Sequence, residues 1–162
     1  TTQVAIIMGS DSDLPIVEAA FPILDSFGIT FTKNVMSAHR TPHDVMELIK
    51  NSEQNGCKVF IAAAGMAAHL AGAVAAHSTK PVIGIPIESG GMGGIDSLLS
   101  TAMMPPGVPV ATVAVGKSGA KNSAILAVQI LATSDDDLAR KLKDYKENMR
   151  AEVLEKDKKL NS

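Results

Sequence analysis

Short, almost uninterrupted apolar runs alternate along this chain with segments whose apolar residues recur at helical spacing. Continuous apolar runs are typical of strands buried on both faces, and their alternation with helices favours a parallel sheet covered on both sides. We therefore predict a three-layer α/β fold with a long C-terminal helix. The expected strands are Val4–Met8, Thr30–Val35, Lys58–Ala63, Pro81–Pro86 and Val108–Val115. The expected helices are Leu14–Phe27, Pro42–Asn55, Ala67–Ala76, Gly94–Thr101, Asn122–Ala132 and Asp135–Lys159.

Charge is spread unevenly along the 162 residues, because half of the 15 basic and 17 acidic residues lie in the last 28 positions. We expect residues 1–134 to form the body of one domain and residues 135–162 to form a helical arm of that domain. A body so poor in charge predicts burial against further copies of itself, hence a homo-oligomer. A neutral surface rich in alanine and glycine is the alternative. The arm carries a narrow apolar stripe, made of Leu138, Leu142, Tyr145, Met149 and Val153.

Composition excludes several kinds of protein. A net charge of −2 argues against a nucleic-acid partner, which requires basic surface. The single cysteine, Cys57, excludes an internal disulfide, and the four scattered histidines lack the spacing of a metal site. The longest stretch without acidic or basic residues, 59–79, holds His69 and His77 and indicates a buried strand and helix, not a membrane span. No signal segment is visible, so we expect a cytoplasmic protein.

Ligands of parallel sheets bind outside the carboxyl ends of the strands, so the loops that follow the strands hold the candidate residues. After the first strand, residues 9–13 offer the hydroxyls of Ser10 and Ser12 to an anion, or form a plain turn in which Asp13 caps the next helix. After the second strand, His39 titrates near neutral pH and Arg40 supplies a fixed cation. An incidental surface pair is the alternative for these two residues.

The remaining loops are rich in small residues. Residues 64–72 follow the third strand and allow a close approach to a ligand, and His69 is either a ligand group or a satisfied core residue. Residues 86–94 follow the fourth strand and form either a mobile cover over a site or a slack surface loop. Residues 116–121 form the loop that we expect after the fifth strand. We expect Met103 and Met104 in the core.

Four ordered motifs run through the chain: Met8–Asp13, Ser37–Pro42, Ala67–Leu70, and Asp96–Leu98 leading to Met104–Val110. Together they resemble the family of N5-carboxyaminoimidazole ribonucleotide mutases, the small carboxylase subunit of purine biosynthesis. The resemblance implies a flavodoxin-like fold and a homo-octamer whose active site is shared between subunits. It also implies a reaction that moves a carboxyl group from the exocyclic nitrogen of a ribonucleotide to C4 of its imidazole ring. No ATP, biotin, metal or other cofactor is implied.

The same resemblance assigns roles to residues of this chain. It implies that His39 is the general acid and base, that Ser10 and Arg40 hold the phosphate, and that Asp13 holds the ribose hydroxyls. Ser12 and Ser37 would line the same pocket. The residues implied to enclose CO2 and the reacting ring are Gly65, Ala67, His69 and Leu70.

Three positions depart from the family pattern, and one of them is Met103, where the family usually has glutamine. The other two follow the third strand. Met66 stands where the family has glycine, and Ala71 stands where it has proline. Methionine adopts a positive φ less readily than glycine and adds bulk where CO2 would sit. The run Ala67-Ala68-His69-Leu70 favours the mutase branch of the family. The alternatives are a carboxylase that uses free CO2 and aminoimidazole ribonucleotide, and a nucleotide-binding module of the same fold without catalysis.

Overall fold

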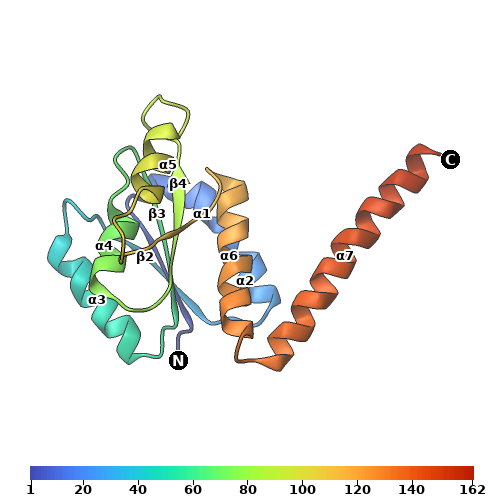
Figure 1. Cartoon of the computed structure of the whole chain (residues 1–162), viewed down its shortest axis with the longest axis horizontal. Helices are drawn as coiled ribbons and strands as arrows, with labels where there is room; N and C mark the ends of the chain where they lie inside the picture. The colour runs from blue at the N-terminus through green and yellow to red at the C-terminus, as the bar shows by residue number, and fades with distance from the viewer.

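The structure is a computed structural model that describes all residues from 1 to 162. Its core is a five-stranded sheet in which every neighbouring pair of strands is parallel, with the order β2-β1-β3-β4-β5 (Figure 1). This is the strand order of flavodoxin-like sheets, so the predicted fold class is confirmed. The strands are β1 (Val4–Met8), β2 (Phe31–Val35), β3 (Val59–Gly65), β4 (Val82–Ile87) and β5 (Ala111–Thr112).

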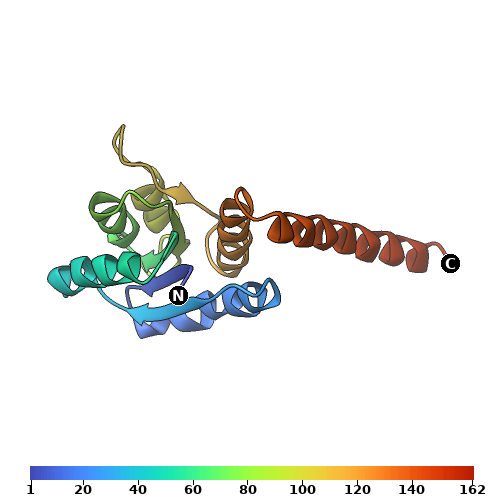
Figure 2. The same cartoon turned by 90° about the horizontal axis from the view of Figure 1, so that it is seen from below.

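Helices cover both faces of the sheet, as Figures 1 and 2 show. Successive side chains of a strand point to opposite faces, and β1 divides accordingly. Ile6 packs in the apolar cluster on one face, which contains Val17 and Val128. Ile7 packs in the cluster on the other face, which contains Ile49 and Val74. No helix is both long and apolar enough to cross a membrane. The helices are α1 (Leu14–Val17), α2 (Phe21–Ser26), α3 (Pro42–Gln54), α4 (Leu70–His77), α5 (Ile95–Ala102), α6 (Lys117–Ala132) and α7 (Asp136–Leu160).

The single helix expected over residues 14–27 is wrong in detail. A 3-10 turn, Glu18–Ala20, separates α1 from α2. Pro22 has no N–H to donate to the carbonyl group of residue 18, so a regular α-helix loses a hydrogen bond at this point. Asp13 makes no side-chain capping bond to α1. The capping bond of this loop comes instead from Ser10, whose hydroxyl accepts from the backbone N–H of Ser12.

Two other predicted boundaries are wrong. The strand expected over residues 108–115 shrinks to the two residues of β5 at the edge of the sheet, where Pro109 has no N–H to offer a ladder. Residues 117–121, expected in a loop, form the first turns of α6. Met103, expected in the core, has 78% of its surface exposed at the end of α5.

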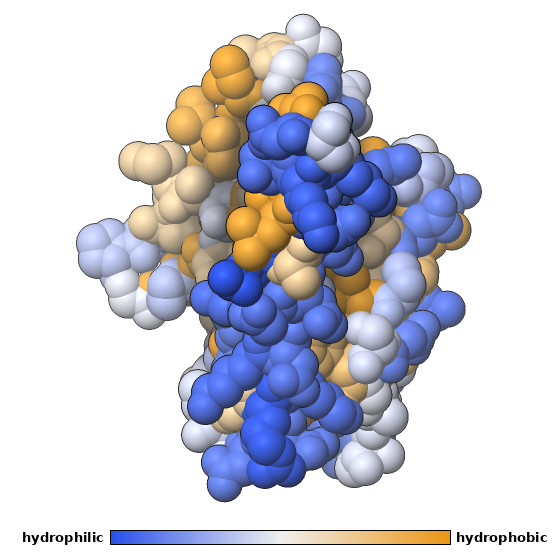
Figure 3. Space-filling view, turned by 90° about the vertical axis from the view of Figure 1, so that its right-hand side faces the viewer, coloured by the Kyte–Doolittle hydropathy of each residue, from blue (hydrophilic) through white to orange (hydrophobic).

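Helix α7 joins the body only through its first three turns. Asp135 caps it by accepting from the N–H groups of Asp137 and Leu138, and Leu138 is buried in the core. Tyr145 lies with its ring centre 5.7 Å from that of Phe27. Beyond this point α7 extends away from the body, and its exposed flank is mostly polar (Figures 1–3). Its apolar side chains there, Met149, Val153 and Leu154, are exposed.

Candidate active site

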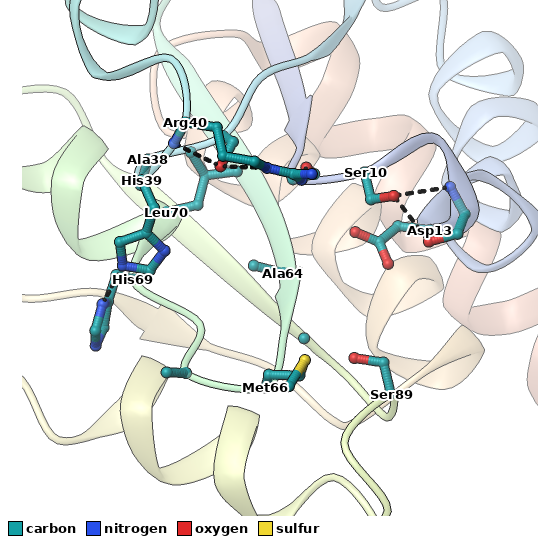
Figure 4. A pocket seen from close by; sticks show the side chains of 15 residues that line it. Ser10, Asp13, Ala38, His39, Arg40, Ala64, Met66, His69, Leu70 and Ser89 are labelled. Atoms are coloured by element: carbon teal, nitrogen blue, oxygen red, sulfur yellow. Dashed lines mark hydrogen bonds between the residues drawn. The ribbon is translucent and has the colours of Figure 1, made fainter.

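The predicted site residues meet at one cavity of about 560 Å³ (Figure 4). The cavity lies at the carboxyl ends of β1, β2, β3 and β4. Here β1 pairs with β2 on one side and with β3 on the other, so the chain crosses from one side of β1 to the other between β2 and β3. This switch point is the usual ligand site of such sheets. All ten residues singled out from the sequence line it: Ser10, Ser12, Asp13, Ser37, His39, Arg40, Gly65, Ala67, His69 and Leu70.

One part of the cavity combines a cation with several hydroxyl groups. The guanidinium of Arg40 is held by two acceptors, since its Nη2 donates to the carbonyl of Gly9 at 3.1 Å and its Nε donates to Oγ of Ser37 at 3.3 Å. The hydroxyls of Ser10 and Ser12 lie 2.9 Å apart and share a hydrogen bond. No carboxylate pairs with Arg40. Its charge and these hydroxyls are therefore available to a phosphate group.

Asp13 supplies an acid to the same cavity. Its side chain is only 5% exposed. Burial raises the pKa of the Asp13 carboxyl above its ordinary value, and a backbone hydrogen bond at Ser10 partly opposes this, while the charge of Asp11 adds to it. A buried carboxylate without a cationic partner destabilises the fold, and it is a strong hydrogen-bond acceptor. These properties fit a residue that accepts hydrogen bonds from the hydroxyls of a ligand.

Two histidines, each in the segment after a different strand, meet in the part of the cavity away from Asp13. Nε2 of His39, after β2, lies 2.7 Å from Nδ1 of His69, which precedes α4. The rings meet edge to face, with centres 4.8 Å apart. Sequence spacing alone did not pair these residues, which are 30 positions apart. Across the chain, no three His, Cys, Asp or Glu side chains lie close enough together to hold a metal ion.

Five lining residues lie outside the predicted set: Gly9, Ala38, Ala64, Met66 and Ser89. Ser89 follows β4 and points its hydroxyl inward (Figure 4), and a Cβ on Gly65 would clash with that hydroxyl. Met66 lines the cavity with φ of 54°, the only residue other than glycine with a positive φ. The position of Ser89 directly after a strand was the signal that could have found it.

Comparison with known proteins identifies the family of this chain. The family model described as AIR carboxylase matches residues 3–152. This chain belongs to the AIR carboxylase family. Within the family, it is 52% identical over 158 residues to the N5-carboxyaminoimidazole ribonucleotide mutase of Thermotoga maritima, covering 98% of this chain and 91% of that one.

Two further proteins are similar to this chain over nearly its whole length. The mutase of the same name from Bacillus subtilis is 51% identical over 152 residues, or 94% of each chain. A crystal structure of Treponema denticola PurE superposes over all of both chains with a TM-score of 0.90 and 31% identity.

Proposed function

We propose that this chain is an N5-carboxyaminoimidazole ribonucleotide mutase, which converts its substrate to 4-carboxyaminoimidazole ribonucleotide. The observation that carries the proposal is the contact of His39 with His69 in the cavity that also holds Arg40 and Asp13. The substrate has a ring, a phosphate and a ribose. The histidine pair can serve the ring, the fixed cation the phosphate, and the buried acid the ribose. Relatives at about half identity carry the name of this enzyme.

The arrangement of the cavity suggests how the ribonucleotide binds. The phosphate lies against Arg40 and the hydroxyls of Ser10, Ser12 and Ser37. The ribose hydroxyls donate to Asp13, so the ring extends toward His39. The small residues Gly65 and Ala67, with Leu70 and His69, enclose the carboxyl group that is transferred. Closure of the site by such residues would keep released CO2 next to the ring and exclude water.

His39 moves the protons of the proposed reaction. As the N–C bond of the substrate breaks and CO2 is released, the protonated ring of His39, an imidazolium, donates a proton to the exocyclic nitrogen. The electron pair at ring carbon C4 then attacks CO2, and the C4 proton returns to His39. Since the two transfers cancel, the reaction needs no net acid or base. When Nδ1 of His69 accepts the Nε2 proton of His39, the other nitrogen of His39, Nδ1, is free to carry these protons.

We further propose that the active protein is a cytoplasmic homo-octamer, in which residues 1–134 form the catalytic body and residues 135–162 form an arm. One exposed face of α5 supports this, because Ile95, Leu99 and Met103 lie four residues apart and are each more than half exposed. Exposed apolar side chains in such a row are typical of a surface that other subunits cover. Helix α5 is also hydrogen-bonded, through Ser100, to Ala68 in the turn that lines the cavity, which suits a site shared between subunits.

The test is a pair of assays without ATP on the purified protein. One assay supplies N5-carboxyaminoimidazole ribonucleotide at low bicarbonate, and the other supplies aminoimidazole ribonucleotide over a range of bicarbonate. We expect rapid conversion of the first substrate and slow conversion of the second. A preference for the second that rises with CO2 would place the chain with the CO2-using carboxylases. Binding without turnover of either substrate would leave a nucleotide-binding module.

A further inference from the structure

The turn that leads from β3 to α4 contains a conformation that methionine rarely adopts. Met66 has φ of 54° in a chain whose other positive φ angles all belong to glycine. Left-handed backbone is strained for residues with a Cβ, and such strain persists only where neighbouring groups hold the backbone in place. The structure therefore has to contain the groups that hold this turn.

The hydroxyl of Ser100, on helix α5, is one of them. The backbone N–H of Ala68 donates to Oγ of Ser100 at 2.8 Å. The hydroxyl of Ser100 has one proton, and its nearest acceptor is the carbonyl of Asp96 on its own helix, 2.7 Å away. The carbonyl of Met66 lies farther from the same hydroxyl, at 3.4 Å. Ser100 thus links α5 to the turn at Ala68, two residues after the strained Met66.

The turn carries the second histidine of the active site. The N–H of His69 donates to the carbonyl of Ala67 at 2.9 Å, and the ring of His69 meets that of His39 at 2.7 Å. His69 makes no side-chain capping bond to α4, so no such bond fixes its ring. A shift of the backbone at Ala68 therefore moves the ring of His69 relative to His39.

We propose that Ser100 is a positioning residue that holds the strained turn at Met66 and thereby sets the contact between His69 and His39. Ser100 does not line the cavity, so it acts through Ala68. The inference rests on the proposed function for its kinetic consequence, but its structural part does not. A turn held by Ser100 also tolerates methionine at a position whose backbone suits glycine.

A double-mutant cycle tests the proposal with Ser100→Ala, Met66→Gly and the two together. Glycine removes the strain at residue 66, so the anchor matters less in its presence. We expect Ser100→Ala to lower kcat about tenfold in the parent chain, with KM within about twofold, and to lower it about twofold in the Met66→Gly background. Ser100→Thr keeps the hydroxyl and should restore kcat. An equal loss in both backgrounds would overturn the proposal.

Ser97→Ala is the matched control. Ser97 lies on the same helix, but its hydroxyl donates within the α5 segment, to the carbonyl of Gly94 at 3.0 Å. We expect kcat of this variant to stay within about twofold of the parent. A loss as large as that of Ser100→Ala would mean that general weakening of α5 explains both results.

A second measurement separates this inference from the proposed function. Hydrogen exchange of the Ala68 amide and the nitrogen NMR signals of the two histidine rings are recorded on the protein without substrate. We expect hydrogen exchange at the Ala68 amide to be at least about tenfold faster in Ser100→Ala, and both ring signals to change. Ser97→Ala should show neither effect. These readouts decide the role of Ser100 even if the parent chain fails to convert the ribonucleotide. Unchanged exchange and ring signals in Ser100→Ala would overturn it.

Discussion

His39 reaches His69 with one ring nitrogen and faces the cavity with the rest of its ring, so removal of the imidazole should affect chemistry more than binding. We expect His39→Asn to keep the fold and substrate affinity and to lower kcat about 10²–10⁴-fold, the range of general acid–base catalysis. Steady-state kinetics and calorimetric binding measure the two effects. His43→Asn, an exposed histidine outside the cavity, is the control and should retain kcat. Full turnover in His39→Asn would contradict the assigned role.

Asp13 gives a prediction in which stability and activity change in opposite directions. Since burial raises the pKa of its carboxyl, the folded chain binds more protons than the unfolded chain between the ordinary and the raised pKa. Stability therefore falls as pH rises through that window, and at neutral pH the charged carboxylate destabilises the fold. We expect Asp13→Asn to raise Tm at pH 7, with the gain disappearing near pH 3, where both side chains are neutral.

The same Asp13→Asn variant should bind ribonucleotide poorly, with kcat/KM lowered about tenfold or more, because a charged acceptor for the ribose is lost. Asp25→Asn, an exposed acid on α2, is the control for both measurements. A Tm gain that persists unchanged at pH 3 would mean that desolvation of the carboxylate is not its cause.

Single residues also show how far the sequence predicts the site. The ten predicted residues come together because each lies at or after the carboxyl end of a strand, and parallel strands bring these ends to one edge. Ser89 was missed because its glycine-rich surroundings suggest slack chain, whereas its inward position depends on the absence of a side chain at Gly65. The contact of His39 with His69 depends on tertiary packing across β1, which periodicity does not describe.

Among whole elements, buried strands and amphipathic helices were predicted within a few residues, since their apolar patterns match the layers that cover them. The exceptions have local causes. Pro22 interrupts the first helix, and Pro109 has no N–H with which to extend the ladder of β5. The start of α6 was placed too late because residues 117–121 present lysine, serine and glycine rather than an apolar stripe.

Gly119, within that misplaced segment, gives a prediction about the packing of α6. Alanine has the higher helix propensity, by about 1 kcal/mol. A Cβ at residue 119, however, would clash with the backbone carbonyl of Ala114, which cannot rotate away as a side chain does. We expect Gly119→Ala to lower the free energy of unfolding by about 2 kcal/mol or more, measured by urea denaturation.

Gly72, inside α4, is the matched control for Gly119. A Cβ there would meet only the flexible end of Met104, with the sulfur 3.2 Å away. We expect Gly72→Ala to leave the free energy of unfolding within about 1 kcal/mol of the parent. If Gly119→Ala were as stable as Gly72→Ala, the close approach of α6 to Ala114 would not constrain this position.

For the molecule as a whole, the uneven distribution of charge predicted a separate arm, and the structure divides that arm into two parts. Leu138, Leu142 and Tyr145 pack against the body, whereas Met149, Val153 and other apolar side chains beyond them are exposed. The sequence could not separate the two parts because the apolar spacing continues unchanged through both. Only the packing against α6 and Phe27 distinguishes the half that belongs to the fold.

This division determines where a truncation tests the oligomer without unfolding the subunit. Removal of everything after Ser134 would take Leu138 out of the core and uncover Phe27, so it would report on folding. Removal of residues 149–162 leaves those contacts in place and deletes only the exposed part of the stripe. Each large apolar side chain buried in an interface contributes about 1.5–3 kcal/mol, so several per subunit suffice to hold an assembly together.

We therefore expect the chain truncated after Asn148 to keep the circular dichroism and cooperative unfolding of the parent, while light scattering shows a species smaller than the proposed octamer. Glu152→Gln, on an exposed part of the same helix, is the control and should leave the mass unchanged. If the active site is shared between subunits, the truncated chain should also lose activity in proportion to its dissociation. An intact octamer after truncation would assign assembly to the body, where the exposed row on α5, Ile95, Leu99 and Met103, is the next surface to alter.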